Sequence, residues 1–247
     1  MKMKFSKHKN GHEQKNKRVL VLDNDIGFNG MSSQKIVDIV RSIHQDENKK
    51  IDLYESRNNV FPEDIGVYDA IILSGSSASA YQQEPWIKTL KEIVKESGET
   101  GKNILGICFG HQIIASVYGA EVISSGNFEV GWKDVLVSKD PLFRGLPTSV
   151  NQYEIHKDII PVVPENLEVI AQNSFGIQAI RVKGTNICGV QFHPEIDQNT
   201  GKYILKSRAD QLKHFGISID DCIKTYDASS DYGTTIIRNF LMGVDQQ

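Results

Sequence analysis

The distribution of apolar residues predicts alternating strands and helices in the first half of the chain. Short continuous apolar runs, typical of strands buried on both faces, occur at 19–22, 51–54, 70–73 and 104–107. Apolar residues recur at helical spacing over 33–43 and 86–94, and a further helical stretch over 113–118 ends at Gly119. Strands alternating with helices predict a parallel sheet covered by helices on both faces.

The pattern changes after Gly119, where apolar runs are separated by short turns. Strands are expected at 121–124, 132–137, 148–153, 167–171, 178–182 and 187–192, and short connections favour antiparallel pairing. Helices are expected at 202–215 and 231–242, with a polar loop at 216–230 between them. No repeat or linker divides the chain, so we expect a single domain at 18–247 preceded by a polar tail at 1–17.

Composition narrows the class of protein. The chain has 247 residues, of which 39% are hydrophobic and 24% charged, as is ordinary for a soluble globular protein. A net charge of −3 gives no strong attraction to nucleic acid or anionic membrane, so neither is an expected partner. No apolar run approaches the ~20 residues that span a bilayer. Residues 1–17 are Lys-rich and lack the apolar segment of a signal peptide, which predicts a disordered tail. A weak nucleic-acid-binding or targeting role for this tail is the alternative.

The cysteines argue for a reducing compartment. There are three, an odd and sparse number that does not suit a disulfide framework, so we expect a cytoplasmic protein. Cys188 lies in an apolar run and is expected to be inert core, and Cys222 lies in a polar stretch with no assigned role. Neither has a second Cys or His at metal-ligand spacing, so no metal site is expected.

The remaining cysteine, Cys108, lies where a predicted strand runs into a helix, within Gly106–Gln112 (G-I-C-F-G-H-Q). The flanking glycines allow a tight bend and a close approach of two elements. A thiol at a helix start feels the positive end of the helix dipole, which favours the thiolate. This is the logic of a nucleophile elbow with Cys in place of Ser. The alternative is a buried structural thiol.

A second motif supplies a base for this thiol. His193, Pro194 and Glu195 follow the apolar run at 187–192. His193 can take the thiol proton and return it to a leaving amine, while Glu195 can orient the imidazole ring. Pro194 stiffens the pair. The alternatives are a structural histidine at a strand end and a solvated surface acid.

Attack on an amide carbonyl also needs two donors for the oxyanion that forms. The backbone N–H of Phe109, directly after the thiol, is one candidate, and that of Gly75, after the strand at 70–73, is the other. Asp23, the 74–76 loop, Cys108 and His193 all follow predicted strands, so they are expected at one rim of the sheet. A simple turn at 74–76 is the alternative, and helix capping is the expected use of Asp23 and Asn24.

Together, G-I-C-F-G-H-Q and H-P-E resemble the class I (triad) glutamine amidotransferases, from about Arg18 to the C-terminus. Segment 74–87 is similar to the amidotransferase domain of GMP synthase and to plant γ-glutamyl peptidases. The resemblance implies a three-layer α/β/α, flavodoxin-like fold, with a mostly parallel open sheet and added antiparallel strands. It also implies that Cys108 is the nucleophile, His193 the base and Glu195 the orienting acid.

The resemblance implies further site residues. Gln112 would bind the amino acid part of the substrate, with a surface glutamine as the alternative. Segment 129–132 would line the glutamine pocket through Gly131 and Trp132, although Trp132 is equally suited to core packing. His156 would lie near the mouth and compete with His193 as base, but it lacks the Pro-Glu partner. The family usually has two adjacent glycines where this chain has Gly75-Ser76, which leaves the geometry of the oxyanion hole open.

The implied reaction is hydrolysis of the glutamine side-chain amide through a glutamyl thioester, without a cofactor. The chain has no room for an ATP-pyrophosphatase domain and no Walker-type phosphate loop, so the ammonia is expected to pass to a separate synthetase. One alternative is a stand-alone γ-glutamyl peptidase. Another is a catalytically silent regulatory module, against which the complete set Cys108, His193 and Glu195 argues.

Overall fold

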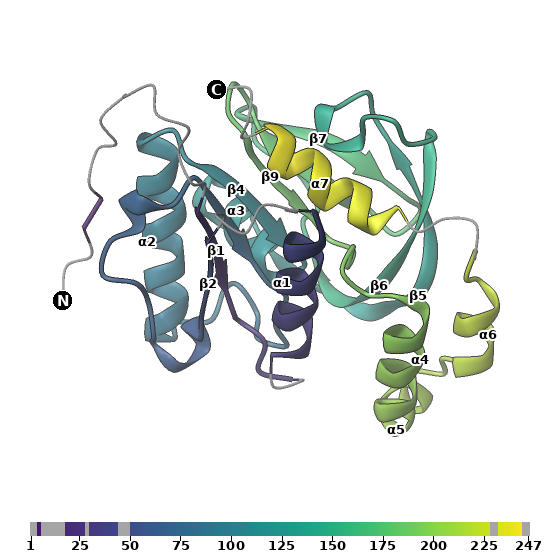
Figure 1. Cartoon of the computed structure of the whole chain (residues 1–247). Helices are drawn as coiled ribbons and strands as arrows, with labels where there is room; N and C mark the ends of the chain where they lie inside the picture. Colours follow the sequence, from purple (N-terminus) through teal and green to yellow (C-terminus); the bar gives the residue numbers. More distant parts are fainter. Residues whose placement is uncertain (1–3, 6–17, 28–29, 44–49, 228–231, 244–247) are drawn as a thin grey trace.

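The computed structural model describes residues 4–5, 18–27, 30–43, 50–227 and 232–243 (Figure 1). Its strands are β1 (Arg18–Leu22), β2 (Lys50–Tyr54), β3 (Ala70–Leu73), β4 (Asn103–Ile107), β5 (Ile123–Val137), β6 (Ser149–Ile159), β7 (Leu167–Gln172), β8 (Ile177–Val182) and β9 (Ile187–Val190). Its α-helices are α1 (Met31–Ile43), α2 (Pro85–Glu99), α3 (Phe109–Val117), α4 (Gln198–Ser207), α5 (Ala209–His214), α6 (Ile219–Lys224) and α7 (Gly233–Gly243). Short 3-10 helices lie at Ser56–Asn58, Ile65–Val67 and Pro141–Phe143.

Within these residues the strands form one sheet of nine, in the order β2-β1-β3-β4-β9-β8-β7-β5-β6. The five from β2 to β9 are parallel, and the remaining pairings are antiparallel. Helices α1 and α7 pack on one face of the parallel part, and α2 and α3 pack on the other. Figure 1 shows α1 and α2 on opposite sides of β1. The three-layer α/β/α prediction is thus confirmed.

The sequence pattern missed the continuity of β5. Two strands were expected, at 121–124 and 132–137, but β5 runs unbroken over Ile123–Val137. The polar residues at 125–129 hide it, because strand pairing rather than alternating polarity holds this segment. Ile123 pairs with Ile159 and Glu129 with His156 on β6, with a register shift between Ser124 and Glu129. The same pairing extends β6 well beyond the expected 148–153.

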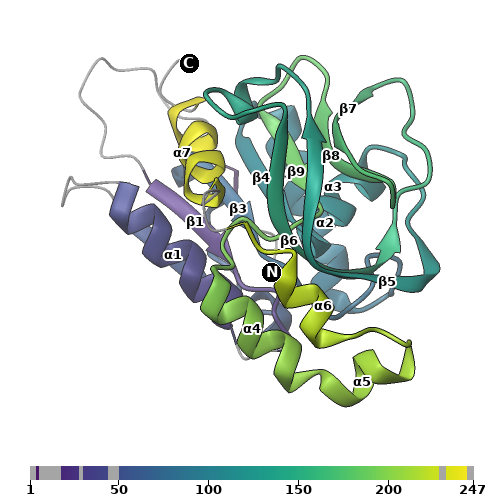
Figure 2. The same ribbon diagram turned by 90° about the vertical axis from the view of Figure 1, so that its right-hand side faces the viewer.

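The loop expected at 216–230 was wrong in its centre, where α6 forms. The Ser218 hydroxyl caps this helix by accepting a hydrogen bond from Asp221 N–H at 3.3 Å. One apolar contact explains the helix: Cys222 is buried against Val130 and Trp132 of β5. The helix expected at 202–215 is instead two helices, α4 and α5, that meet at Arg208. Figure 2 shows α4, α5 and α6 grouped beside β5 and β6.

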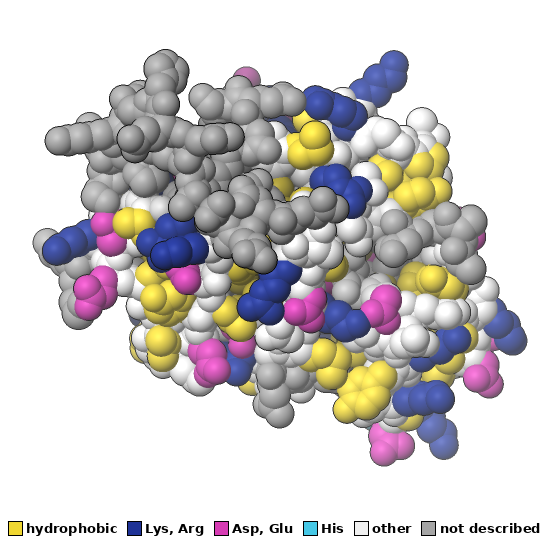
Figure 3. All heavy atoms as spheres, viewed as in Figure 1, with side chains coloured by type: hydrophobic (Ala, Val, Ile, Leu, Met, Phe, Trp, Pro, Cys, Tyr) yellow, Lys and Arg dark blue, Asp and Glu magenta, His cyan; other side chains and the backbone are white. Residues whose placement is uncertain are grey.

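Only part of the predicted tail is described. Lys4 accepts a hydrogen bond from Ile65 N–H and donates one to Glu63 O, both at 3.0 Å, and Phe5 packs against the core on the α2 face. The other residues of 1–17, and residue 231 of the last predicted helix, lie outside the described residues. None of the described helices is long and apolar enough to cross a membrane. On the face in Figure 3, basic and acidic side chains are interspersed.

Candidate active site

The sharp turn after β4 carries Cys108. Its backbone has φ 50° and ψ −100°, an unusual conformation for a residue other than glycine and one typical of strained functional turns. Cys108 N–H donates to Val190 O at 2.8 Å, which ties the turn to the end of β9. A Cβ at position 106 would lie 2.4 Å from the backbone of Gly110, so strand and helix approach this closely only with glycine there. The turn has the geometry predicted for a nucleophile elbow.

Cys108, His193 and Glu195 meet at this turn, all buried. His193 hydrogen bonds with the thiol of Cys108, and its Nδ1 lies 2.7 Å from Glu195 Oε1. Burial lowers the pKa of His193, but the carboxylate of Glu195 and the Cys108 sulfur outweigh it and raise that pKa well above its ordinary value. The arrangement favours an imidazolium beside the sulfur.

Two neighbours hold the His–Glu pair in place. Ser32, on α1, donates its hydroxyl to Glu195 Oε1 at 2.5 Å. His193 N–H donates to Tyr153 O on β6 at 2.8 Å, which fixes the backbone under the imidazole. The sequence reasoning did not find Ser32, because serines at a helix start are common and nothing local relates this one to Glu195, 163 positions away.

The loop after β3 brings Gly75 against the triad. A Cβ at this position would lie 2.8 Å from His193 Cε1 and 3.6 Å from Cys108 Cβ, so only glycine fits. Asn24 secures the loop: its N–H donates to Ser74 Oγ and its side-chain amide to Ser74 O, both at 2.9 Å. Phe109 begins α3, where backbone N–H groups have no acceptor within the helix. Both predicted oxyanion donors therefore come from residues next to Cys108.

Gln112 lines the same cavity, but its amide group is already used within the protein. Its Nε2 donates to Asp158 O at 3.2 Å and to Gln191 Oε1 at 3.0 Å. Gln191 in turn directs its own Nε2 at Cys108 Sγ, 3.5 Å away. Gln112 is thus placed to position Gln191. Its predicted contact with the substrate stays a prediction.

The cavity at the triad has a volume of about 160 Å³. Gly75, Cys108 and His193 line one end. Elsewhere its wall includes Arg208, at the junction of α4 and α5, and Gln211 on α5. The sequence reasoning missed Arg208 because it placed this residue inside one continuous helix. The cavity therefore reaches from the thiol to a cationic side chain.

The structure does not bring Gly131 and Trp132 to this cavity. Gly131, at φ +89°, packs on α6, where an added Cβ would lie 2.8 Å from Cys222 Cβ. The Trp132 ring packs against Tyr153 and Tyr226, with centroid distances of 5.0 and 5.1 Å. This is the core-packing alternative for Trp132. The segment belongs to the small apolar cluster that α6 completes, which the sequence reasoning had treated as loop.

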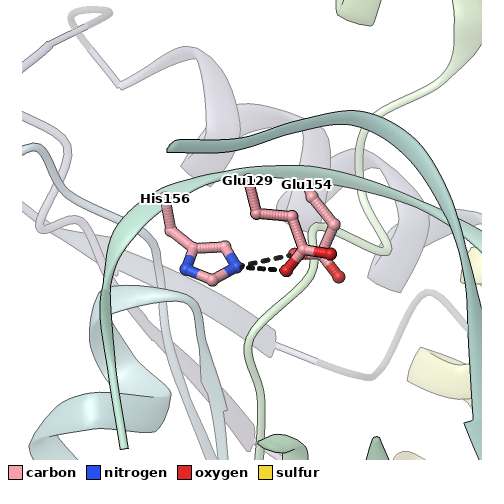
Figure 4. A group of neighbouring side chains, drawn as sticks. All are labelled: Glu129, Glu154 and His156. Atoms are coloured by element: carbon pink, nitrogen blue, oxygen red, sulfur yellow. Dashed lines mark hydrogen bonds and ion pairs between the residues drawn. The ribbon is translucent and has the colours of Figure 1, made fainter. Parts of the chain in front are cut away.

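His156 lies in the cavity wall, but neither ring nitrogen is available to take the thiol proton. Nδ1 faces Asp158 O at 3.0 Å and Nε2 faces Glu129 Oε2 at 2.9 Å (Figure 4). Burial lowers the pKa of His156, whereas hydrogen bonds to Glu129 and Glu154 raise it, with a net value of about 10. This environment favours His193 over His156 as the base.

An α/β sheet with a cysteine at its elbow and a His–Glu pair opposite defines a class of thiol-dependent amide-processing folds. Residues 20–211 match the family model described as "Glutamine amidotransferase class-I". The chain therefore belongs to the class-I glutamine amidotransferase family, as its sequence motifs indicated.

Relatives and solved structures agree with this assignment. The chain is 24% identical to γ-glutamyl peptidase 5 of Arabidopsis thaliana over 252 residues, covering 96% of this chain and 99% of that protein. It is 35% identical to a glutamine-hydrolysing GMP synthase of Staphylococcus saprophyticus over 154 residues, covering 62% of this chain but only 28% of that protein. A glutamine amidotransferase structure from Thermotoga maritima has the same fold, with a TM-score of 0.78, 23% identity, and coverage of 94% of this chain and 100% of that one.

Proposed function

We propose that this chain hydrolyses the side-chain amide of L-glutamine, with Cys108 as nucleophile, His193 as general base and acid, and Glu195 as the orienting carboxylate. The observation that carries the proposal is the continuous hydrogen-bonded line from Ser32 through Glu195 and His193 to Cys108. A structural thiol has no need of such a line, whereas a nucleophile needs a base that a third group orients.

The steps follow from these positions. The thiolate of Cys108 attacks the γ-carbonyl carbon, and the carbonyl electrons move to its oxygen, which accepts hydrogen bonds from Gly75 N–H and Phe109 N–H. As the oxyanion collapses, the C–N bond breaks and His193 gives its proton to the leaving nitrogen, which departs as ammonia. Water then attacks the thioester while His193 takes its proton. Glutamate leaves and Cys108 regains its sulfur charge or proton.

The test is ammonia and glutamate release from L-glutamine by the purified chain, with Cys108→Ala as the variant and Cys188→Ala as the matched control. Cys188 is a buried thiol on β9, on the sheet strand next to β4. We expect Cys108→Ala to abolish turnover and Cys188→Ala to retain it. Loss of labelling of Cys108 by a glutamine-like chloroketone, together with no turnover, would count against the enzyme.

The fate of the ammonia is a separate proposal. The glutamine-hydrolysing GMP synthase relative is matched over 28% of its length, so most of that protein has no counterpart in this match. We infer that ammonia formed here serves a synthetase on a separate chain. Glutamine turnover that is slow alone and rises at least tenfold with a partner purified from the source cells would support this. Full-rate glutaminase activity in isolation would argue against partner gating.

A second candidate, a γ-glutamyl peptidase, is favoured by the cavity and by the relative that matches over nearly its whole length. The cavity wall beyond the triad includes Arg208, whose guanidinium suits a carboxylate. In a γ-glutamyl dipeptide that carboxylate would be the C-terminal one. Glutamine has no group at this end.

The two candidates differ in a measurable way. If Arg208 binds the dipeptide carboxylate, Arg208→Gln raises KM for a γ-glutamyl dipeptide at least tenfold and leaves glutamine turnover within about threefold, since one charge-assisted hydrogen bond is worth about 1.5–3 kcal/mol. Capping the dipeptide as a C-terminal amide should weaken the native enzyme equally and the variant little. The control is Arg144→Gln, an exposed arginine outside the cavity. Equal losses for both substrates would contradict carboxylate recognition.

A further inference from the structure

A second cluster of ionisable side chains lies between β5 and β6, and the proposed reaction does not use it. Glu129 on β5 lies directly opposite His156 on β6 in the strand register. Glu154 is two residues before His156, so both side chains leave β6 on the same face. Figure 4 shows the two carboxylates directed at Nε2 of the imidazole. All three residues are buried.

Glu154 is the unusual member of this cluster. Among the described residues, neither of its carboxylate oxygens has a hydrogen-bond partner, and its exposed fraction is 0%. The nearest cationic atom is His156 Nε2, 3.4 Å from Oε2. A buried carboxylate without hydrogen bonds is unfavourable unless a positive group compensates it. His156 is shared with Glu129, which lies closer to it, at 2.9 Å.

We propose that Glu129, Glu154 and His156 form a binding site for a zinc-class divalent cation, behind the wall of the active-site cavity. The three candidate ligand atoms lie within 4.8 Å of one another. The distances from Nε2 to the two carboxylate oxygens, 2.9 and 3.4 Å, bracket the edge of about 3.3 Å expected for tetrahedral ligands with bonds of 2.0–2.1 Å. One imidazole with two carboxylates suits zinc and similar borderline cations.

The surroundings match those of metal ligands. His156 Nδ1 lies 3.0 Å from Asp158 O, so it donates to that carbonyl and leaves Nε2 for a cation, the usual support of a ligating histidine. Glu129 Oε1 accepts from Asn173 Nδ2 at 2.5 Å, and Oε2 accepts from Gln178 Nε2 at 2.7 Å. These bonds orient one carboxylate in advance. Because His156 lines the cavity, the cluster has a route to solvent through it.

A cation here would join β5 to β6, which carries Lys157 and Asp158 of the cavity wall. Two carboxylates and a neutral imidazole would balance its charge, and Glu154 would gain the partner that it lacks. Binding to the folded form alone raises stability by mass action. The site is therefore expected to act as a metal staple behind the substrate cavity, independent of whether glutamine or a γ-glutamyl peptide is the substrate.

The test is calorimetric titration of the full chain with Zn²⁺ in the Cys108→Ala background. That substitution is needed because Cys108, His193 and Glu195 could themselves bind Zn²⁺. We expect one equivalent to bind and to raise Tm. Adding Glu154→Gln should weaken the affinity at least tenfold, while adding Glu165→Gln, at an exposed position, should leave it unchanged. Absence of saturable binding in the Cys108→Ala protein, or equal affinity in the Glu154→Gln protein, would overturn the proposal.

A second measurement avoids substitutions in the cluster, in case Glu154→Gln does not fold. Zn²⁺ added to isotope-labelled Cys108→Ala protein should shift the imidazole Nε2 resonance of His156 and leave its Nδ1–H resonance in place, because Nδ1 keeps its bond to Asp158 O. A Zn²⁺-induced shift confined to other histidines would place the metal elsewhere and refute the site.

Discussion

Gly75→Ala tests whether close packing on the catalytic histidine controls activity. The added methyl carbon would start 2.8 Å from His193 Cε1, whereas carbon atoms in ordinary contact lie about 3.5 Å or more apart. The imidazole or the loop must therefore move by about 0.7 Å. The ring cannot move freely, because Nδ1 is held at 2.7 Å by Glu195, which Ser32 holds in turn.

A misplacement of about 1 Å in an active site can reduce the rate about a hundredfold. We therefore expect kcat/KM for the preferred substrate to fall by about 10- to 100-fold, equivalent to about 1.4–2.7 kcal/mol of transition-state stabilisation. The fall should appear mainly in kcat, since the triad rather than the far end of the cavity is disturbed. Steady-state ammonia release and the rate of Cys108 alkylation by a glutamine-like chloroketone measure it.

The matched control is Ser77→Ala, which removes a hydroxyl from the same cavity wall without adding a carbon near His193. Thermal unfolding of both variants separates a local effect from lost folding. If folded Gly75→Ala retains kcat/KM within about twofold of the native chain, close packing of the loop on His193 does not position the base, and the reasoning fails.

Three further predictions concern the triad and the core behind it. Glu195→Gln should lower kcat by about 10³- to 10⁴-fold, because a neutral amide neither stabilises the imidazolium nor selects its tautomer; a stopped ammonia assay measures this, and an unchanged kcat would remove Glu195 from the triad. Since the pKa of His193 is raised, its stabilising contribution is fully present below its unfolded pKa of about 6.5 and is lost as pH rises through the folded pKa. Urea unfolding across pH should therefore show the native chain exceeding Glu195→Gln most at low pH, and a gap that widens with pH would contradict this. Gly131→Ala should reduce the free energy of unfolding by about 2–4 kcal/mol, through a φ of +89° and the contact with Cys222, and wild-type urea stability would refute that packing.

The parallel half of the fold was predictable because each of its strands is buried on both faces. A strand such as β3, in which all four residues are buried, reads as a continuous apolar run whatever its neighbours are. The order of strands then places Cys108 and His193 at one edge, since carboxyl ends of adjacent parallel strands coincide. Local patterns thus carried enough information for the elbow and for the segment that contains its base.

The antiparallel half was less predictable because its segments are stabilised by pairing rather than by their own pattern. The middle of β5 is polar, and only its register with β6 makes it a strand. Helix α6 is short, and it forms where Cys222 is covered by Val130 and Trp132. The same dependence explains why Gly131 was expected in the substrate pocket and instead lies against α6.

By itself, the sequence determined the layered α/β fold, the turn that carries Cys108 and the His–Pro–Glu segment, because burial periodicity and glycine placement are properties of short segments. Tertiary structure alone decided which polar groups meet: Ser32 with Glu195, Asn24 with Ser74, Arg208 with the cavity, and Glu129 with His156. A polar side chain carries no local mark of its partner. Strand register and helix packing choose that partner, and they exist only once the chain has folded.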